Sequence, residues 1–221
     1  TVAFITGIYE ELLSSLAGLS PAKLLLIKDK GFATFWLEIN GAFLLTLFTG
    51  ILLSVFSLAK IISFLLVTWP LFVWSFFFGL IVASVHLVGK GVKRWGRAAI
   101  FGLLIGVVFA YSVTLLSPTS IEATGITVFG AGFIAISAMI LPGISGSFIL
   151  VLLGMYQEVL LAVKSLDIPV LAMFALGCVC GLMVMSRVLT WAFRKYHDLT
   201  LAILTGVMLG ALNKVWPWKE A

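Results

Sequence analysis

The segment Leu141-Pro-Gly-Ile-Ser-Gly-Ser147 interrupts a long apolar stretch, residues 126–163. That stretch is too long for one membrane-spanning helix, which needs about 20 residues, and the Pro142-Gly143 pair breaks a helix. Lipid offers no hydrogen-bond partner to an open backbone, so an irregular chain at membrane depth must be buried in protein or line a cavity. We expect a re-entrant helical hairpin here. Two full membrane crossings are the alternative, since they would place the flanking loops on the same sides of the membrane as a hairpin does.

The composition places this interruption in a bilayer. The chain of 221 residues is 62% hydrophobic and 10% charged, whereas soluble domains contain about 45–50% apolar and about 25% charged residues. We therefore expect an all-α integral membrane protein with little room for a soluble domain. The sequence has no aromatic–basic stripe of the kind that binds nucleic acid, and its two histidines, His86 and His197, are isolated, so no metal site is expected.

Basic residues orient the expected membrane spans, because they concentrate in cytoplasmic loops. The apolar stretches that fit membrane spans are 41–59, 70–89, 98–116, 168–193 and the shorter 199–215. One orientation puts every basic cluster on the cytoplasmic side: Lys23, Lys28 and Lys30; Lys90, Lys93, Arg94 and Arg97; Arg194 and Lys195. The loop 117–126, without Lys or Arg, is then outside. The result is a multi-pass topology.

A short pattern occurs twice in the chain. Gly7-Ile-Tyr-Glu-Glu-Leu-Leu13 matches Gly154-Met-Tyr-Gln-Glu-Val-Leu160. Further along, two glycine pairs have the same separation: Gly50 and Gly79, and Gly181 and Gly210. The charge tracing gives the two halves opposite orientations, and inverted repeats with broken helices are typical of transporters. Chance similarity between apolar segments is the alternative.

These observations predict an inverted-repeat helical bundle with two re-entrant helical hairpins. Residues 1–97 form the first inverted repeat, whose N-terminal hairpin arm is missing from the sequence. Residues 98–125 form a linking transmembrane helix and an outer loop, and residues 126–221 form the second inverted repeat.

The interrupted segment is also the strongest candidate for a binding site. Glycines let a ligand approach the backbone closely, serine hydroxyls donate hydrogen bonds, and the free N–H groups at a helix start attract anions. The segment therefore suits a phosphate or carboxylate head group; the candidate residues are Pro142, Gly143, Ile144, Ser145, Gly146 and Ser147. A Pro-Gly kink between closely packed helices is the alternative.

Four charged residues remain open to two interpretations. Arg187 lies inside the expected span 168–193, where it either faces inward and binds substrate phosphate or extends to the lipid phosphates. Glu10, Glu11 and Glu158 follow the repeated Gly-x-Tyr pattern. Acids within the membrane often couple transport to protons, whereas acids at an interface are ordinary solvated helix ends.

The sequence does not indicate an enzyme. The nucleophile pattern Gly-x-Ser-x-Gly is absent, since Gly143-Ile-Ser-Gly146 is one residue too short, and no second motif supplies a histidine base. We therefore expect no catalytic residue and no cofactor. A small-anion channel or exchanger, and with less support a lipid phosphatase, remain as alternatives to a transporter.

Several strings resemble a bacterial and archaeal membrane family, formerly a domain of unknown function and now assigned as polyprenyl-phosphate transporters. The matching strings cover nearly the whole chain and begin at Phe4, Ile39, Trp74, Ile136, Gly154, Leu204 and Trp216. Members of that family carry another copy of the interrupted element, Pro-Gly-Val-Ser-Gly-Gly, ahead of the position of Thr1.

The resemblance implies a flippase of the cytoplasmic (inner) membrane. Its substrate would be undecaprenyl phosphate, the lipid carrier that is recycled for cell-wall and envelope glycan synthesis. The expected partners are therefore this polyprenyl-phosphate lipid and the membrane. The Gly102-x-x-x-Gly106 pattern could also pair helices between copies, which would make a homo-oligomer.

Overall fold

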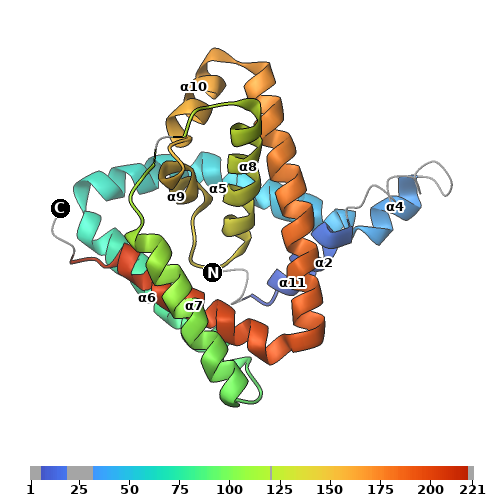
Figure 1. Cartoon of the computed structure of the whole chain (residues 1–221), viewed down its shortest axis with the longest axis vertical. Helices are drawn as coiled ribbons and strands as arrows, with labels where there is room; N and C mark the ends of the chain where they lie inside the picture. Colours follow the sequence, from blue (N-terminus) through green and yellow to red (C-terminus); the bar gives the residue numbers. More distant parts are fainter. Residues whose placement is uncertain (1–5, 19–31, 120, 219–221) are drawn as a thin grey trace.

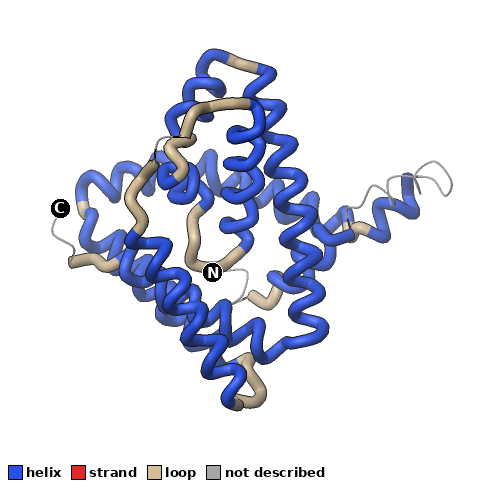
Figure 2. The backbone as a smooth tube through the Cα atoms, in the orientation of Figure 1, coloured by secondary structure: helices blue, strands red, loops and turns tan. Residues whose placement is uncertain are grey.

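The computed structural model describes residues 6–18, 32–119 and 121–218, and the described part consists of helices joined by loops, without strands (Figures 1 and 2). The basic cluster Lys23, Lys28 and Lys30 and the first five residues of the chain lie outside the described residues. The elements are α2 (Tyr9–Gly18), α4 (Phe32–Glu38), α5 (Gly41–Thr68), α6 (Pro70–Lys90), α7 (Arg97–Leu115), α8 (Gly125–Ile140), α9 (Gly146–Leu152), α10 (Tyr156–Ser165), α11 (Ile168–Ala211) and the 3₁₀ turn η1 (Leu212–Val215).

Three described helices, α6, α7 and α11, are long and apolar enough to cross a membrane. The helices α9 and α10 form a fourth candidate span, which is bent by 107° at the short turn between them. The expectation of an all-α membrane protein is therefore confirmed. The expected spans 168–193 and 199–215 belong to one helix, α11, which is kinked at Tyr196 (φ −136°, ψ 52°).

Helix α11 organises the bundle, because α8 packs along its first arm and α7 along its second (Figure 1). Glycines of α11 make both crossings close: Gly181 lies against the Phe133 carbonyl of α8, and Gly210 against the Val107 carbonyl of α7. The α7 glycines Gly102 and Gly106 pack against this same α11. The Gly-x-x-x-Gly face is therefore used within the chain, and a homo-oligomer stays a prediction.

The two occurrences of the repeated pattern have the same local structure. Gly7 (φ 74°) and Gly154 (φ 70°) both adopt left-handed backbone, which favours glycine. Two residues later, a ten-residue helix begins at Tyr9 in one case and at Tyr156 in the other.

The helices that follow also correspond. Trp69, between α5 and α6, has φ −136° and ψ 61°, close to the backbone of Tyr196. Trp69 and Tyr196 are separated in sequence by the same distance as Gly41 and Ile168, where α5 and α11 begin. This structural correspondence pairs Gly50 with Gly177 and Gly79 with Gly206, one helical turn earlier than the glycines matched from the sequence.

Candidate functional site

The helical path is interrupted between α8 and α9, as predicted, over residues 141–145. Gly143 adopts φ 93°, and a Cβ atom there would lie 3.1 Å from the Met208 Cα and 3.2 Å from the Ala211 Cβ of α11. A Cβ on Gly146 would lie 2.9 Å from the Ala135 carbonyl oxygen of α8. Both positions therefore require glycine, and the break is wedged between α8 and the second arm of α11.

The two serines of the break present their hydroxyl groups at its surface. Ser145 and Ser147 are exposed, and their Oγ atoms are 2.8 Å apart. Neither hydroxyl caps α9, which begins at Gly146 and has only seven residues. A helix this short contributes only a small dipole, so the hydroxyl groups and nearby cations decide how well the break holds an anion.

Lys214 brings a cation to the break, and the sequence analysis missed it. Its Nζ lies 4.4 Å from the ring centroid of Phe148, the residue directly after Ser147. Lys214 is in η1, at the end of α11, and 66 residues after Phe148 in sequence. In the sequence, Lys214 lies just before the Trp216-Pro-Trp218 string, and basic and aromatic residues are ordinary at the end of a membrane span. Nothing in that local pattern pointed to a binding role.

An apolar cavity of about 430 Å³ adjoins the break. Leu141 and Ile144 of the break form part of its wall, and α7, α8 and α9 supply most of the rest, including Val113, Ala138 and Leu152. Few polar groups face it. The break therefore lies between a polar, hydroxyl-bearing surface and a hydrocarbon-lined space.

Arg187 is exposed on α11 and lines a different cavity, about 450 Å³ in volume, together with Arg194 and Lys195. No hydrogen bond or ion pair found among the described residues joins Arg187 to the break, and no break residue lines its cavity. Its assignment to the head-group site therefore stays a prediction. Arg194 and Lys195 were not among the site residues predicted from the sequence.

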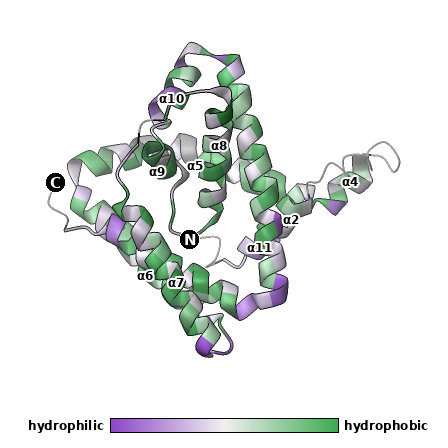
Figure 3. Ribbon diagram, in the orientation of Figure 1, coloured by the Kyte–Doolittle hydropathy of each residue, from purple (hydrophilic) through white to green (hydrophobic). Residues whose placement is uncertain are grey.

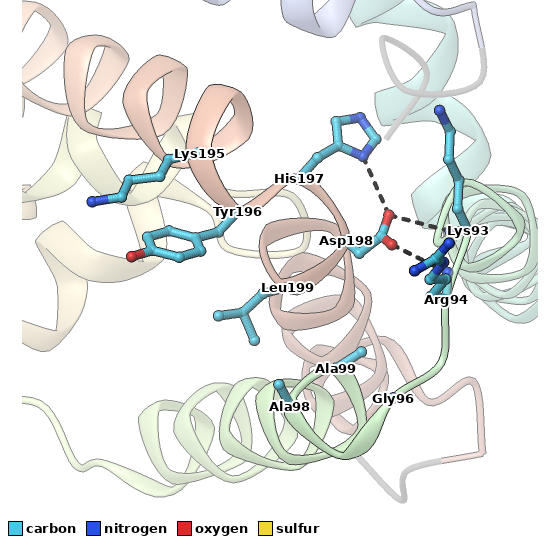
Figure 4. Close-up of a pocket in the computed structure, with 10 residues that line it drawn as sticks. All are labelled: Lys93, Arg94, Gly96, Ala98, Ala99, Lys195, Tyr196, His197, Asp198 and Leu199. Atoms are coloured by element: carbon cyan, nitrogen blue, oxygen red, sulfur yellow. Dashed lines mark hydrogen bonds and ion pairs between the residues drawn. The ribbon is translucent and has the colours of Figure 1, made fainter.

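Glu10 belongs to a polar chain at the α11 kink. Its Oε1 lies 3.4 Å from Nε2 of His197, whose Nδ1 lies 3.6 Å from Oδ1 of Asp198. Asp198 in turn accepts hydrogen bonds from the backbone N–H groups of Lys93 (3.2 Å) and Arg94 (3.1 Å), as Figure 4 shows. His197 is isolated from His86 and from Glu10 in the sequence, so this network was not predicted.

The other two acids have different surroundings. Glu11 Oε1 accepts a hydrogen bond of 2.7 Å from Asn40 Nδ2. Glu158 is exposed in the first turn of α10. A role in proton coupling stays a prediction for all three acids.

The kink also brings two basic clusters to one end of the molecule. Lys93 and Arg94, from the loop between α6 and α7, line a cavity of about 600 Å³ together with Lys195. Figure 3 shows hydrophilic residues gathered at this loop and at the kink, with mostly hydrophobic helices above them. This arrangement agrees with the charge tracing, which put both clusters on the same side of the membrane.

The chain is similar to known membrane proteins over its whole length. A family model described as undecaprenyl phosphate translocase-like matches residues 1–221. A polyprenyl-phosphate transporter of Vibrio cholerae is 51% identical over 220 residues, which is 100% of this chain and 71% of that protein. A polyprenyl-phosphate transporter of Staphylococcus aureus is 28% identical over 201 residues, 83% of this chain and 70% of that protein. No solved structure matches the chain significantly.

Proposed function

Since the chain belongs to the undecaprenyl phosphate translocase-like family, we propose that it is a transporter that moves undecaprenyl phosphate across the cytoplasmic membrane. Such a transporter returns the spent lipid carrier for envelope glycan synthesis. The apolar helices α6, α7 and α11 fit a protein of the bilayer. A transporter must also shelter a charged head group while the lipid tail stays in hydrocarbon, so the break in the helical path is the observation that carries the site.

The head group is proposed to bind at residues 142–147. Gly143 and Gly146 permit the tight packing of the break, and the exposed hydroxyls of Ser145 and Ser147 face outward from it. When these hydroxyls turn from each other to a phosphate, both donate to it. Lys214 supplies the positive charge, and hydrogen bonds to charged groups are worth about 1.5–3 kcal/mol each.

The isoprenoid tail is proposed to leave through the apolar cavity beside the break. Leu141 and Ile144 line that cavity, so a lipid whose phosphate is held at the serines can place its first isoprene units against these side chains. A small inorganic anion would gain nothing from this wall. The cavity therefore favours a lipid substrate over the small-anion alternative.

An inverted repeat with re-entrant hairpins is the architecture that we propose for alternating access. The matched glycine and tyrosine positions of α2 and α10, and the matched kinks at Trp69 and Tyr196, support the repeat. The 107° bend between α9 and α10 supports a hairpin that turns back instead of crossing. Broken helices of opposed repeats are where transporters bind their substrates.

The head-group assignment is tested with purified protein in liposomes that contain fluorescent undecaprenyl phosphate. We expect the double substitution Ser145→Ala and Ser147→Ala to slow translocation by about tenfold or more, since each lost hydrogen bond to a charged group is worth about tenfold. Ser165→Ala is the matched control, because that hydroxyl is exposed and bonds only the Leu161 carbonyl within α10. Unchanged translocation in the double variant would remove the head-group assignment.

Glu10 is proposed as the proton-coupling acid, because it is joined to His197 at the kink between the arms of α11. A proton moving onto this pair changes the contact that connects α2 to α11. Glu10→Gln is therefore expected to flatten the pH dependence of translocation, while Glu122→Gln, which changes an exposed acid before α8 that forms no ion pair among the described residues, leaves it in place. The same pH profile in wild type and Glu10→Gln would contradict the coupling role.

A further inference from the structure

The first arm of α11 carries a basic cavity that is separate from the break. We use the name basic cavity for the space of about 450 Å³ lined by Arg187, Thr190, Trp191, Arg194, Lys195 and Ala17. Arg194 and Lys195 follow Arg187 by seven and eight positions, a spacing that puts each of them on the same face of the helix as Arg187. Ala17, near the end of α2, also lines the cavity.

The cations of the basic cavity have no acidic partner among the described residues. The ion pairs found there join His197 to Glu10 and to Asp198, and none includes Arg187, Arg194 or Lys195. Glu10 and Glu11 line an adjoining cavity with Arg194, but neither forms an ion pair with it. Three like charges around one cavity repel each other, so the cavity is suited to an anion that neutralises them.

Thr190 provides an independent observation. Its Oγ1 is buried and has no hydrogen-bond partner among the described residues, and buried polar atoms are rarely left without one. Thr190 lines both the basic cavity and the adjoining cavity with Glu10. Threonine in a helix divides between two χ1 rotamers, so a rotation of this side chain can turn the hydroxyl toward a ligand.

The aromatic residues indicate where the ligand comes from. The Nζ of Lys195 lies 5.7 Å from the ring centroid of Trp191 and 5.3 Å from that of Tyr196, and both rings are exposed. Exposed Trp and Tyr beside basic residues are typical of the depth at which lipid head groups lie. The same end of the molecule holds the basic loop of Lys93 and Arg94.

We propose that the basic cavity binds the phosphate group of a membrane lipid at the cytoplasmic face. Two guanidinium groups, one ammonium group and the Thr190 hydroxyl supply donors for its oxygens, and arginine binds phosphate with two parallel hydrogen bonds. The identity of the lipid rests on the proposed function: undecaprenyl phosphate would bind here after leaving the break. A resident anionic phospholipid has the same chemistry, and the experiment below distinguishes the two.

The test measures lipid binding by native mass spectrometry on the full chain in detergent, titrated separately with undecaprenyl phosphate, phosphatidylglycerol and inorganic phosphate. We expect Arg187→Gln with Arg194→Gln to weaken undecaprenyl phosphate binding by about tenfold or more, as loss of charge-assisted hydrogen bonds does. Thr190→Val, which keeps the shape and removes the hydroxyl, should weaken it by about threefold to tenfold. Lys164→Gln, at an exposed position of α10, is the control for net charge and should change nothing.

The outcomes separate this inference from the proposed function. If phosphatidylglycerol binds as tightly and is lost in the same variants, the phosphate-lipid site stands and its occupant is a bilayer lipid. If the protein binds phosphatidylglycerol in this way but not undecaprenyl phosphate, the proposed function fails while the site remains. If Arg187→Gln with Arg194→Gln binds every lipid like wild type, or if inorganic phosphate binds as well as the lipids do, the inference is overturned.

Discussion

The pair α5 and α6 and the two arms of α11 carry glycines at the same spacing but are packed differently. In α11, Gly177 lies against the Phe129 carbonyl of α8 and Gly206 against the Leu103 carbonyl of α7. At the corresponding positions of α5 and α6, a Cβ atom on Gly50 or Gly79 would meet no atom within 4 Å. The same glycine pattern therefore marks close helix crossings in one half and open surface in the other.

This difference indicates which helices stabilise the described bundle by packing. One buried core centres on α11, with Leu204 and Met208 almost fully buried, and a second lies between α8 and α9. By contrast, Leu53 of α5 and Phe72 of α6 are 66% and 73% exposed. Large apolar side chains are stable at such exposure in contact with lipid. Helix α11 is thus held in place by internal packing, whereas α5 and much of α6 present apolar surface to their surroundings.

Gly177→Leu and Gly206→Leu test this contrast and are expected to have the largest effect on stability. Each new Cβ would overlap a backbone carbonyl of the neighbouring helix, and backbone cannot move aside as a side chain does. We expect each substitution to destabilise the protein by about 3 kcal/mol or more, measured as the midpoint of thermal unfolding in detergent. A midpoint within about one degree of wild type would show that these crossings are looser than described.

A smaller effect on stability is expected from substitutions of the two tyrosines of the repeated pattern. The buried Tyr9 donates a hydrogen bond of 3.0 Å from its hydroxyl to the Ile140 carbonyl, which lies in the last turn of α8 and lacks an intrahelical partner. Tyr9→Phe should therefore cost about 1 kcal/mol. Its counterpart Tyr156 is 39% exposed, and Tyr156→Phe should change the unfolding midpoint little. Equal costs for the two substitutions would contradict the burial of Tyr9 against the end of α8.

The sequence was sufficient to predict the features that depend on local chemistry. Pro142 breaks a helix and Gly143 weakens one further, so the break was predictable. The Gly-x-Tyr pattern at Gly7 and Gly154 was recognisable because both turns need left-handed glycine. The kink at Trp69 also has a local cause, since the proline at position 70 disfavours helical backbone in the preceding residue.

Features that depend on packing between distant segments were not predictable. The residue after Tyr196 is His197, which is neither proline nor glycine, and the kink occurs where Asp198 accepts hydrogen bonds from the backbone of the loop between α6 and α7. Lys214 reaches Phe148, and Glu10 reaches His197, only because α11 folds back along the bundle. The helix starts and kinks align Gly50 and Gly79 with Gly177 and Gly206, a second α11 pair with the same spacing as Gly181 and Gly210, so spacing alone does not distinguish the two matches.

The smallest effect is expected for Gly50→Leu and Gly79→Leu, and it has the opposite sign to that of their counterparts in α11. With no atom within 4 Å of the new Cβ, the added side chain meets no resistance inside the described protein. Leucine favours helix over glycine by about 0.5–1 kcal/mol, so the unfolding midpoint should stay the same or rise slightly. Gly130→Leu on α8, where a Cβ also meets nothing within 4 Å, is the matched control. If the Gly50 and Gly79 substitutions destabilise the protein while Gly130→Leu does not, the surfaces of α5 and α6 are helix-packing sites like those of α11, and the two halves differ less than this bundle indicates.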